Sequence, residues 1–399
     1  MIQEQKHSVT SKIEQAALVA SLLAIFGDAY GAYCLGDTFR YFTVAALAAS
    51  LALVVWKWLR GRSDRRGLPI AITAIFFCLF SYPCWTSPYN AYAYIGILVA
   101  VVLFHIDRKL LDTILIVLLV LSLALGLYEF MTRTYLFSNE MEKNGQWFVY
   151  DLKTAGGWAK ALRVKAFFYG CLSLGFFALG VAFFFNRRTL ILLLCLLTAV
   201  ISGTRLAIIM IIVMIMINPA IKNKYRIFFL PFFVFLLTVG MDFLAAYDSA
   251  SLERIMSVFD METGTHENRI LMWKLGLEQF ASYDILHMLV GDNGLLFSIH
   301  TNNAESGWIT LLTDTGILGF LLYLIPLVHL FIGFVIRRRY HMATVVFLFF
   351  CTNLMVTFNL SSTGNLIYWF CMLKFGELLD APDEKNVPPP VGAGQPESV

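Results

Sequence analysis

The chain has 399 residues, of which 59% are hydrophobic and 14% are charged, and its mean hydropathy is +0.71. Soluble domains carry about 25% charged residues and disordered chains are poor in apolar side chains, so the composition excludes both classes. The formal net charge of +3 is small, and the sequence shows no basic patch of the kind that binds nucleic acid. We therefore expect an integral membrane protein.

Apolar segments long enough for membrane helices recur along the chain. A spanning helix needs about 20 mostly apolar residues, because only a helix satisfies its own backbone in hydrocarbon. The sequence therefore predicts an all-α polytopic fold with about twelve transmembrane helices. They lie near 14–36, 42–58, 68–86, 91–106, 111–129, 166–185, 189–204, 206–218, 227–246, 308–336, 342–360 and 364–379. The first segment follows MIQEQKHSVTSKIEQ without a clear cleavage site, so we expect a retained helix rather than a signal peptide.

The positions of lysine and arginine predict the orientation, because short cytoplasmic loops are enriched in both. With a cytoplasmic N-terminus, 17 of the 30 basic residues fall in inward segments. These are Lys6, Lys12, Lys57, Arg60, Arg62, Arg65, Arg66, Arg108, Lys109, Arg187, Arg188, Lys222, Lys224, Arg226, Arg337, Arg338 and Arg339. The pattern predicts that both termini are cytoplasmic.

This orientation divides the chain into four parts. Residues 1–246 hold about nine transmembrane helices and an outer loop at 131–165. Residues 247–306 form a large outer loop, and loops of that length in a compact protein usually have a function. Residues 307–379 hold the C-terminal transmembrane helices, and 380–399 are rich in proline, glycine and acidic residues, which predicts a disordered cytoplasmic tail.

The sequence offers no metal or cofactor motif. Its seven cysteines all lie in apolar segments without Cys-x-x-Cys or Cys/His ligand spacing, so they are expected to pack as small apolar residues. His266 and His287 have no second His, Asp or Glu at a zinc spacing. We expect neither a metal site nor a cofactor.

A polar break, Ser202-Gly203-Thr204-Arg205, interrupts an otherwise apolar run. An arginine at membrane depth is costly unless it is paired or faces water, so it is a candidate functional group. Arg205 could bind a diphosphate bidentately at the outer face. The alternative is an arginine at a tight turn whose side chain reaches the interface.

The large outer loop predicts an amphipathic helix from Asn268 onward. Ile270, Trp273, Leu277 and Phe280 recur at helical spacing, so the helix could lie on the membrane surface. Arg269 stands at its start, where free N–H groups also attract anions. Arg269 and Arg254 are therefore candidate anion ligands; the alternative is that both are solvated or contact lipid headgroups.

Acid, base and amide groups gather where the chain re-enters the membrane, from His300 to Glu305. Close to lipid, loss of water raises the pKa of a carboxyl group and makes it a better general base, so Glu305 is a catalytic candidate and His300 a second one. The alternative is that Asn303 and Glu305 cap the following helix.

Three of these features together resemble the bacterial O-antigen polymerase and O-antigen ligase superfamily. They are the SGTR break at Arg205, the NRILMW segment at Arg269 and the helix entry AESGWITLLTDTGILG, and they cover residues 189 to 336. Ser306, Trp308, Asp314, Gly316 and Gly319 follow the family register at the helix entry, and Glu305 stands where the ligases carry a histidine.

The resemblance implies a GT-C-like fold in the bacterial inner membrane with a periplasmic active site. It implies a metal-independent glycosyltransferase whose donor is a glycan linked to undecaprenyl diphosphate and whose acceptor is a second glycan. The diphosphate-binding role carries over to Arg205, Arg269 and Arg254, with Arg163 as a further candidate. Expected partners are the lipid-linked glycan, the acceptor, the bilayer and, as an additional candidate, a chain-length regulator; no nucleic acid is expected.

Glu305 in place of histidine favours a polymerase of O-antigen, capsule or exopolysaccharide repeat units. The first alternative is the ligase that transfers the finished glycan to lipid A core. The second alternative is a secondary transporter or flippase, although the sequence shows no convincing internal repeat of the kind common in transporters.

Overall fold

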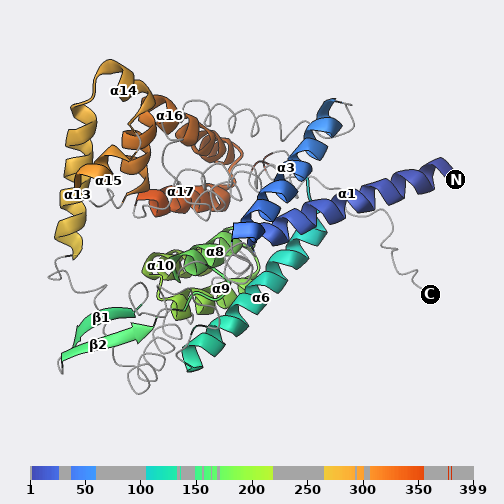
Figure 1. The fold of residues 1–399 in the computed structure, drawn as a ribbon, viewed down its shortest axis with the longest axis horizontal. Coiled ribbons are helices and arrows are strands. Elements are labelled where there is room, and N and C mark those ends of the chain that lie inside the picture. The colour runs from blue at the N-terminus through green and yellow to red at the C-terminus, as the bar shows by residue number, and fades with distance from the viewer. Residues whose placement is uncertain are drawn as a thin grey trace, which may run out of the picture.

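A computed structural model describes residues 2–26, 37–59, 105–132, 135, 149–154, 157–162, 164–168, 171–218, 265–292, 294–300, 306–354, 376 and 379. For the strands and several helix positions, Arg205 and Arg269 among them, it describes the backbone alone. The helices are α1 (Ile2–Phe26), α3 (Asp37–Leu59), α6 (Arg108–Thr132), α8 (Cys171–Phe184), α9 (Thr189–Ser202), α10 (Arg205–Ile217), α13 (Thr265–Ala281), α14 (Ile285–Val290), α15 (Leu295–His300), α16 (Gly307–Ile336) and α17 (Tyr340–Leu354). The described part is mostly helical, as predicted (Figure 1).

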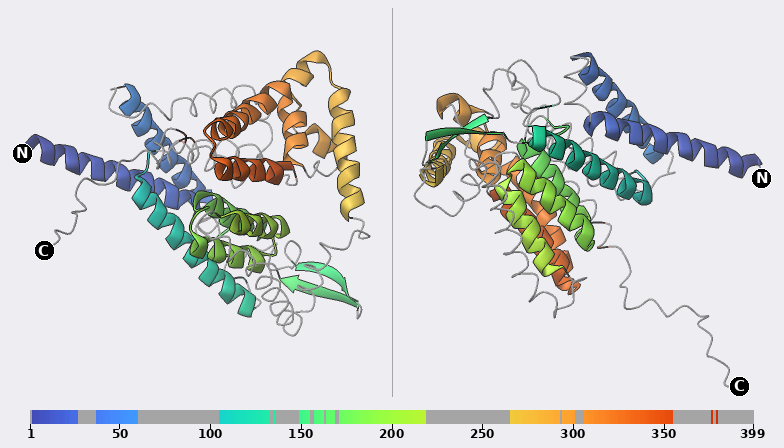
Figure 2. Two further views of the ribbon diagram at one scale, coloured as in Figure 1. Left: turned by 180° about the vertical axis from the view of Figure 1, so that it is seen from behind. Right: turned by 90° about the horizontal axis from the view of Figure 1, so that it is seen from below.

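One two-stranded sheet departs from the all-α prediction. Strands β1 (Val149–Thr154) and β2 (Gly157–Leu162) pair antiparallel, with Val149 opposite Leu162. The hairpin lies within the outer loop predicted at 131–165. Figures 1 and 2 show it at the same end of the molecule as α13.

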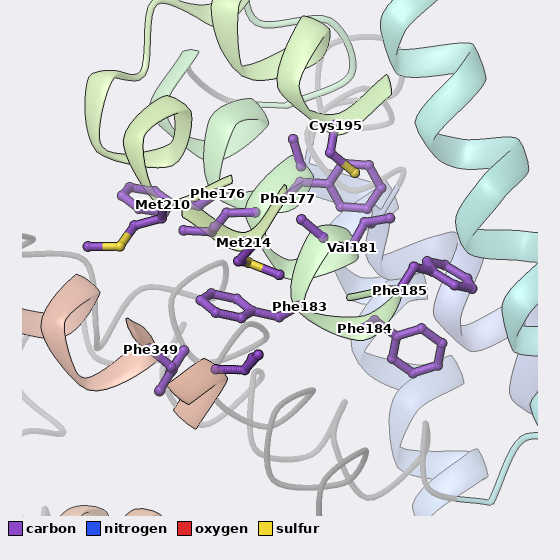
Figure 3. Packing of buried hydrophobic residues seen from close by; sticks show 14 of the residues in the cluster. Phe176, Phe177, Val181, Phe183, Phe184, Phe185, Cys195, Met210, Met214 and Phe349 are labelled. Carbon is purple, nitrogen blue, oxygen red and sulfur yellow. The ribbon is translucent and has the colours of Figure 1, made fainter. Parts of the chain in front are cut away.

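Helix α8 is the centre of the core. Twelve of its fourteen residues are buried, and it packs against α6, α9 and α10. A helix that is apolar on all sides is typical of the interior of a large protein or of a membrane span. Figure 3 shows Phe183 of α8 beside Phe349 of α17, with ring centroids 5.7 Å apart in an edge-to-face arrangement. The core therefore joins the middle of the chain to its C-terminal helices.

The N-terminal helices α1 and α3 pack together through small residues and a buried pair of hydroxyl groups. The hydroxyl oxygens of Ser21 and Ser50 are 2.5 Å apart. The side-chain amide of Gln15 then joins α1 to the start of α6: its Nε2 donates to the His105 carbonyl and its Oε1 accepts from the Asp107 amide, both at 2.9 Å.

Turns that carry basic residues lie together at one end of the helices. Arg188 donates to Asp112 at 2.8 Å, which joins the turn after α8 to the first turns of α6. The Nε2 atom of His341 lies 3.3 Å from Oδ1 of Asn186, which brings the turn between α16 and α17 to the same place. All three turns are predicted to lie on the cytoplasmic side of the membrane, which requires them to lie at the same end of the helices.

Two helices in the described part of the chain, α6 with 25 residues and α16 with 30, are long and apolar enough to cross a membrane. Helix α16 matches the segment predicted at 308–336, but it has an unpredicted break at Gly316, whose φ of 64° and ψ of −169° are not helical. The predicted helices at 68–86 and 227–246, most of those at 91–106 and 364–379, and the tail at 380–399 lie outside the described residues. The number of twelve spans and the division into four parts stay predictions.

Candidate functional site

The six predicted site residues fall on different parts of the structure. Arg205 is the first residue of α10, and Arg269 lies in the first turns of α13. His300 is the last residue of α15. Arg163, Arg254 and Glu305 lie outside the described residues. Whether these side chains converge on one ligand therefore stays a prediction.

The predicted polar break before Arg205 is confirmed as a tight turn between two antiparallel helices. Helix α9 ends at Ser202, and the Gly203 amide donates to the Val200 carbonyl at 2.9 Å, which closes the last turn. Helix α10 then begins at Arg205. The break needs glycine and small polar residues because their backbone and side-chain hydrogen bonds replace those that the helix loses.

Buried hydroxyl groups fix this turn to the start of α8. The Ser202 and Thr204 hydroxyl oxygens are 2.9 Å apart, and Thr204 lies 3.2 Å from the Cys171 carbonyl oxygen, to which it donates. Any side chain at Gly175 would overlap Thr204. The backbone of Arg205 is thus held against α8, and the free N–H groups of the first turn of α10 lie at this end.

A buried carboxylate holds a second segment at the same end. Oε2 of Glu129, near the end of α6, accepts from the backbone amides of Lys165 at 3.0 Å and Ala166 at 2.9 Å. Val164 packs in one small apolar cluster with Ile201, which precedes the Arg205 turn. The segment that directly follows the candidate Arg163 is therefore fixed beside that turn.

The outer helices α13 and α14 attach to the molecule through the break in α16. Helix α14 ends at Val290, and a Cβ atom at the following residue, Gly291, would overlap the Asp314 backbone. A Cβ atom at Gly316 would overlap the Leu289 carbonyl group. The Asp292 amide donates to the Thr313 carbonyl at 2.9 Å. Two glycines thus let two backbones touch, and α14 docks into the break.

Polar groups surround this junction, which we call the α14–α16 junction. Oδ1 of the buried Asp314 accepts from the Gly294 amide at 3.3 Å, and the Tyr283 hydroxyl donates to the Thr313 carbonyl at 3.3 Å. Burial, and then the charges of Asp292 and Asp314, raise the pKa of Tyr283 above its ordinary value. This cluster was not predicted from the sequence. The sequence feature that could have indicated it is a pair of similar segments, Gly291–Gly294 and Thr313–Gly316. In each segment an aspartate stands among glycines or small polar residues.

The predicted helix is confirmed, but it begins at Thr265 rather than at Asn268, so Arg269 is its fifth residue. Its apolar stripe is divided between two surroundings. Helix α13 packs against α16. Trp273 and Phe280 are half-buried, whereas Ile270 and Leu277 are 65% and 50% exposed. The stripe therefore lies at the edge of the contact with α16, partly toward the protein and partly away from it.

His287 has a side chain that is 45% exposed and a partner on the same helix turn. Its Nδ1 lies 2.7 Å from Oδ1 of Asp284, the residue that caps α14. The hydrogen bond from the His287 backbone amide, followed by that from its ring, holds the pKa of the Asp284 carboxyl below its usual range. His287 thus stabilises the start of α14.

The chain matches no known protein family, and no characterised protein shows significant similarity to it.

Proposed function

We propose that this chain is a multi-pass protein of the bacterial inner membrane that polymerises glycan repeat units linked to undecaprenyl diphosphate at the periplasmic face. The proposal rests on the residues that resemble the O-antigen polymerase and ligase superfamily. About twelve helices, a GT-C-like arrangement and cytoplasmic termini are parts of the same proposal.

One structural observation supports it best: the candidate elements lie at the end of the helices opposite the basic turns. Helix α10 runs from Arg205 to Ile217, and Asn218 then bonds Thr189, next to Arg188, at 3.4 Å. The Arg205 turn is therefore at the far end from Arg188. Helix α16 likewise runs from the α14–α16 junction to Arg337 at the basic end. A lipid-linked donor whose diphosphate lies at the outer surface would meet both elements there.

In the proposed reaction an acceptor hydroxyl oxygen attacks the anomeric carbon of the donor sugar. The bond from that carbon to the diphosphate oxygen breaks, and undecaprenyl diphosphate leaves with the electron pair. Glu305 takes the hydroxyl proton, and Arg205 and Arg269 stabilise the charge that grows on the leaving diphosphate. The free N–H groups at the start of α10 would add to the same stabilisation.

The first test is the glycan profile of a deletion strain complemented with variants. Arg205→Ala and Arg269→Ala should abolish glycan assembly while the protein stays in the membrane, and Glu305→Gln should do the same if Glu305 is the base. Arg188→Ala is the matched control, because Arg188 lies at the basic end and forms a half-exposed ion pair; it should leave the profile unchanged. Normal polymer from both Arg205→Ala and Arg269→Ala would refute the diphosphate site.

The deletion strain also separates the polymerase from its alternatives. A polymerase deletion leaves lipid A core with a single repeat unit. A ligase deletion leaves full-length polymer on undecaprenyl diphosphate and none on the core. His300 supports the ligase alternative, because it is a part-exposed histidine at the end of α15, shortly before the helix entry. A flippase deletion would instead leave single repeat units on the cytoplasmic side.

A further inference from the structure

The break in α16 divides the helix into two parts with different surroundings. Before Gly316 the helix is enclosed by protein: Trp308 is 6% exposed and Leu311 is fully buried. After Gly316, large apolar side chains are exposed along the helix. They include Ile317, Leu321, Ile325, Val328 and Ile332, which recur every three or four residues and which we call the α16 strip.

The length of the second part matches a bilayer. Residues 317–336 rise about 30 Å as a helix, at about 1.5 Å per residue, and the hydrocarbon core of a bilayer is about 30 Å thick. An exposed apolar strip over this whole length is stable only against lipid or protein. If α16 spans the membrane with this part, the outer edge of the hydrocarbon lies near Gly316.

Helix α14 lies at that same level, because the backbone of Leu289 touches Gly316. One face of α14 is apolar and exposed: Ile285, Leu286 and Leu289 are 80%, 63% and 40% exposed. These positions share one side of a helix, whereas His287, with its partner Asp284, lies on the opposite side. The helix is therefore amphipathic, although it has only six residues.

We propose that the face formed by Ile285, Leu286 and Leu289, the α14 face, inserts into the outer leaflet of the bilayer. The proposal rests on the membrane placement given under Proposed function. The α14 face then continues the α16 strip at its outer end, and the polar side with His287 faces water. Inserted in this way, α14 holds α13 and α15 at the depth where the diphosphate of a lipid-linked donor lies.

A bilayer explains this face better than a protein partner does. A stable protein interface buries about 800 Å² on each side, and three side chains on a short helix provide far less. The contact between the Leu289 backbone and Gly316 also favours lipid, because it places α14 at the outer end of the α16 strip. A second copy of the chain is the competing occupant, and the experiment tests it.

The experiment measures the depth of a nitroxide at three positions, in vesicles of phosphatidylethanolamine and phosphatidylglycerol. p-Acetylphenylalanine at position 286, 325 or 274 carries the label, so the native cysteines stay in place. Position 325 lies in the middle of the α16 strip, and Lys274, on α13, has a side chain 71% exposed and an ion pair with Glu278. Power saturation compares access to oxygen, which partitions into lipid, with access to a water-soluble nickel chelate.

We expect lipid-type accessibility at 325, shallower lipid-type accessibility at 286, and water-type accessibility at 274. Water-type accessibility at 286 with lipid-type accessibility at 325 would overturn the inference and leave the membrane placement intact. A label at 286 that neither reagent reaches would mean that protein covers the α14 face. Water-type accessibility at 325 would refute the membrane placement and, with it, the proposed function.

A second measurement uses the unaltered protein in case a labelled variant fails to fold. Vesicles that contain a phospholipid with a photoreactive diazirine near its carboxyl end are irradiated, and the modified peptides are identified by mass spectrometry. Lipid adducts on residues 285–289 support the inference. Adducts on the α16 strip but none on the α14 face would overturn it.

Discussion

The α14–α16 junction makes a sharp prediction for Gly316→Ala. Gly316 has φ 64° and ψ −169°, a backbone region that essentially only glycine adopts and that costs another residue about 1–3 kcal/mol. The new methyl group would also overlap the carbonyl group of Leu289 and lie 2.6 Å from the Gly291 amide nitrogen. These are backbone atoms, which cannot move without lifting α14. Overpacking adds about 1–3 kcal/mol, so we expect a total loss of about 2–6 kcal/mol.

Gly294→Ala is the matched control. Gly294 also has a positive φ, 75°, but a Cβ atom there would have no neighbour within 4 Å. This variant should lose only the backbone term, about 1–2 kcal/mol. The assay is the thermal midpoint of each purified protein in detergent, followed by size-exclusion chromatography. We expect the order wild type, Gly294→Ala, Gly316→Ala. Equal midpoints for the two variants would refute the idea that α14 is packed into the break.

Two further predictions concern a buried and an exposed carboxylate. Glu129→Ala should cost about 2–6 kcal/mol, because it leaves the buried amides of Lys165 and Ala166 without an acceptor, at about 1–3 kcal/mol each; a thermal midpoint equal to that of the wild type would contradict this. The pKa of Asp284 is lower in the folded protein than in the unfolded chain. The carboxylate therefore stabilises α14 above about pH 4, and this stabilisation is lost as the pH falls through the folded-state pKa. Hydrogen exchange of α14, corrected for intrinsic rates, should therefore increase at low pH, and Asp284→Asn, which still caps a helix, should remove that dependence.

Local sequence patterns predicted the helices around the Arg205 turn well. The predicted segments 189–204 and 206–218 differ from α9 and α10 by no more than two residues at either end. The reason is that Ser202, Gly203 and Thr204 interrupt an apolar run in the sequence itself. A polar break costs so much in lipid or in an apolar core that it marks a real turn.

The β-hairpin and the break in α16 were not predicted, for two different reasons. The hairpin had a local signal, two short stretches joined by Ala155-Gly156, but the hydropathy of the loop did not distinguish it from a coil. The break lies in the Thr313–Gly316 segment, but a single glycine such as Gly316 is common inside membrane helices, so this segment alone does not predict the break. Its cause is the backbone of Leu289, which lies far away in the sequence.

The junction also bears on how the proposed site is assembled. The Arg205 turn is fixed to α8 through Thr204, whereas Arg269 and His300 lie on helices α13 and α15, on either side of α14, which docks on α16. The two halves of the proposed site are therefore held in place by different contacts. Binding of a ligand that needs both halves should weaken when either contact is disturbed. Gly175→Ala displaces Thr204, and Gly316→Ala lifts α14.

Each of these two variants should lower glycan assembly by more than its loss of protein in the membrane explains. The matched control is Glu129→Gln, whose side-chain oxygen still accepts the amide hydrogen bonds of Lys165 and Ala166, so it should retain assembly. Loss of assembly in Gly175→Ala alone would place the whole site on the α8–α10 helices. Loss in Gly316→Ala alone would place it on the outer helices, and only loss in both supports a ligand bound between them.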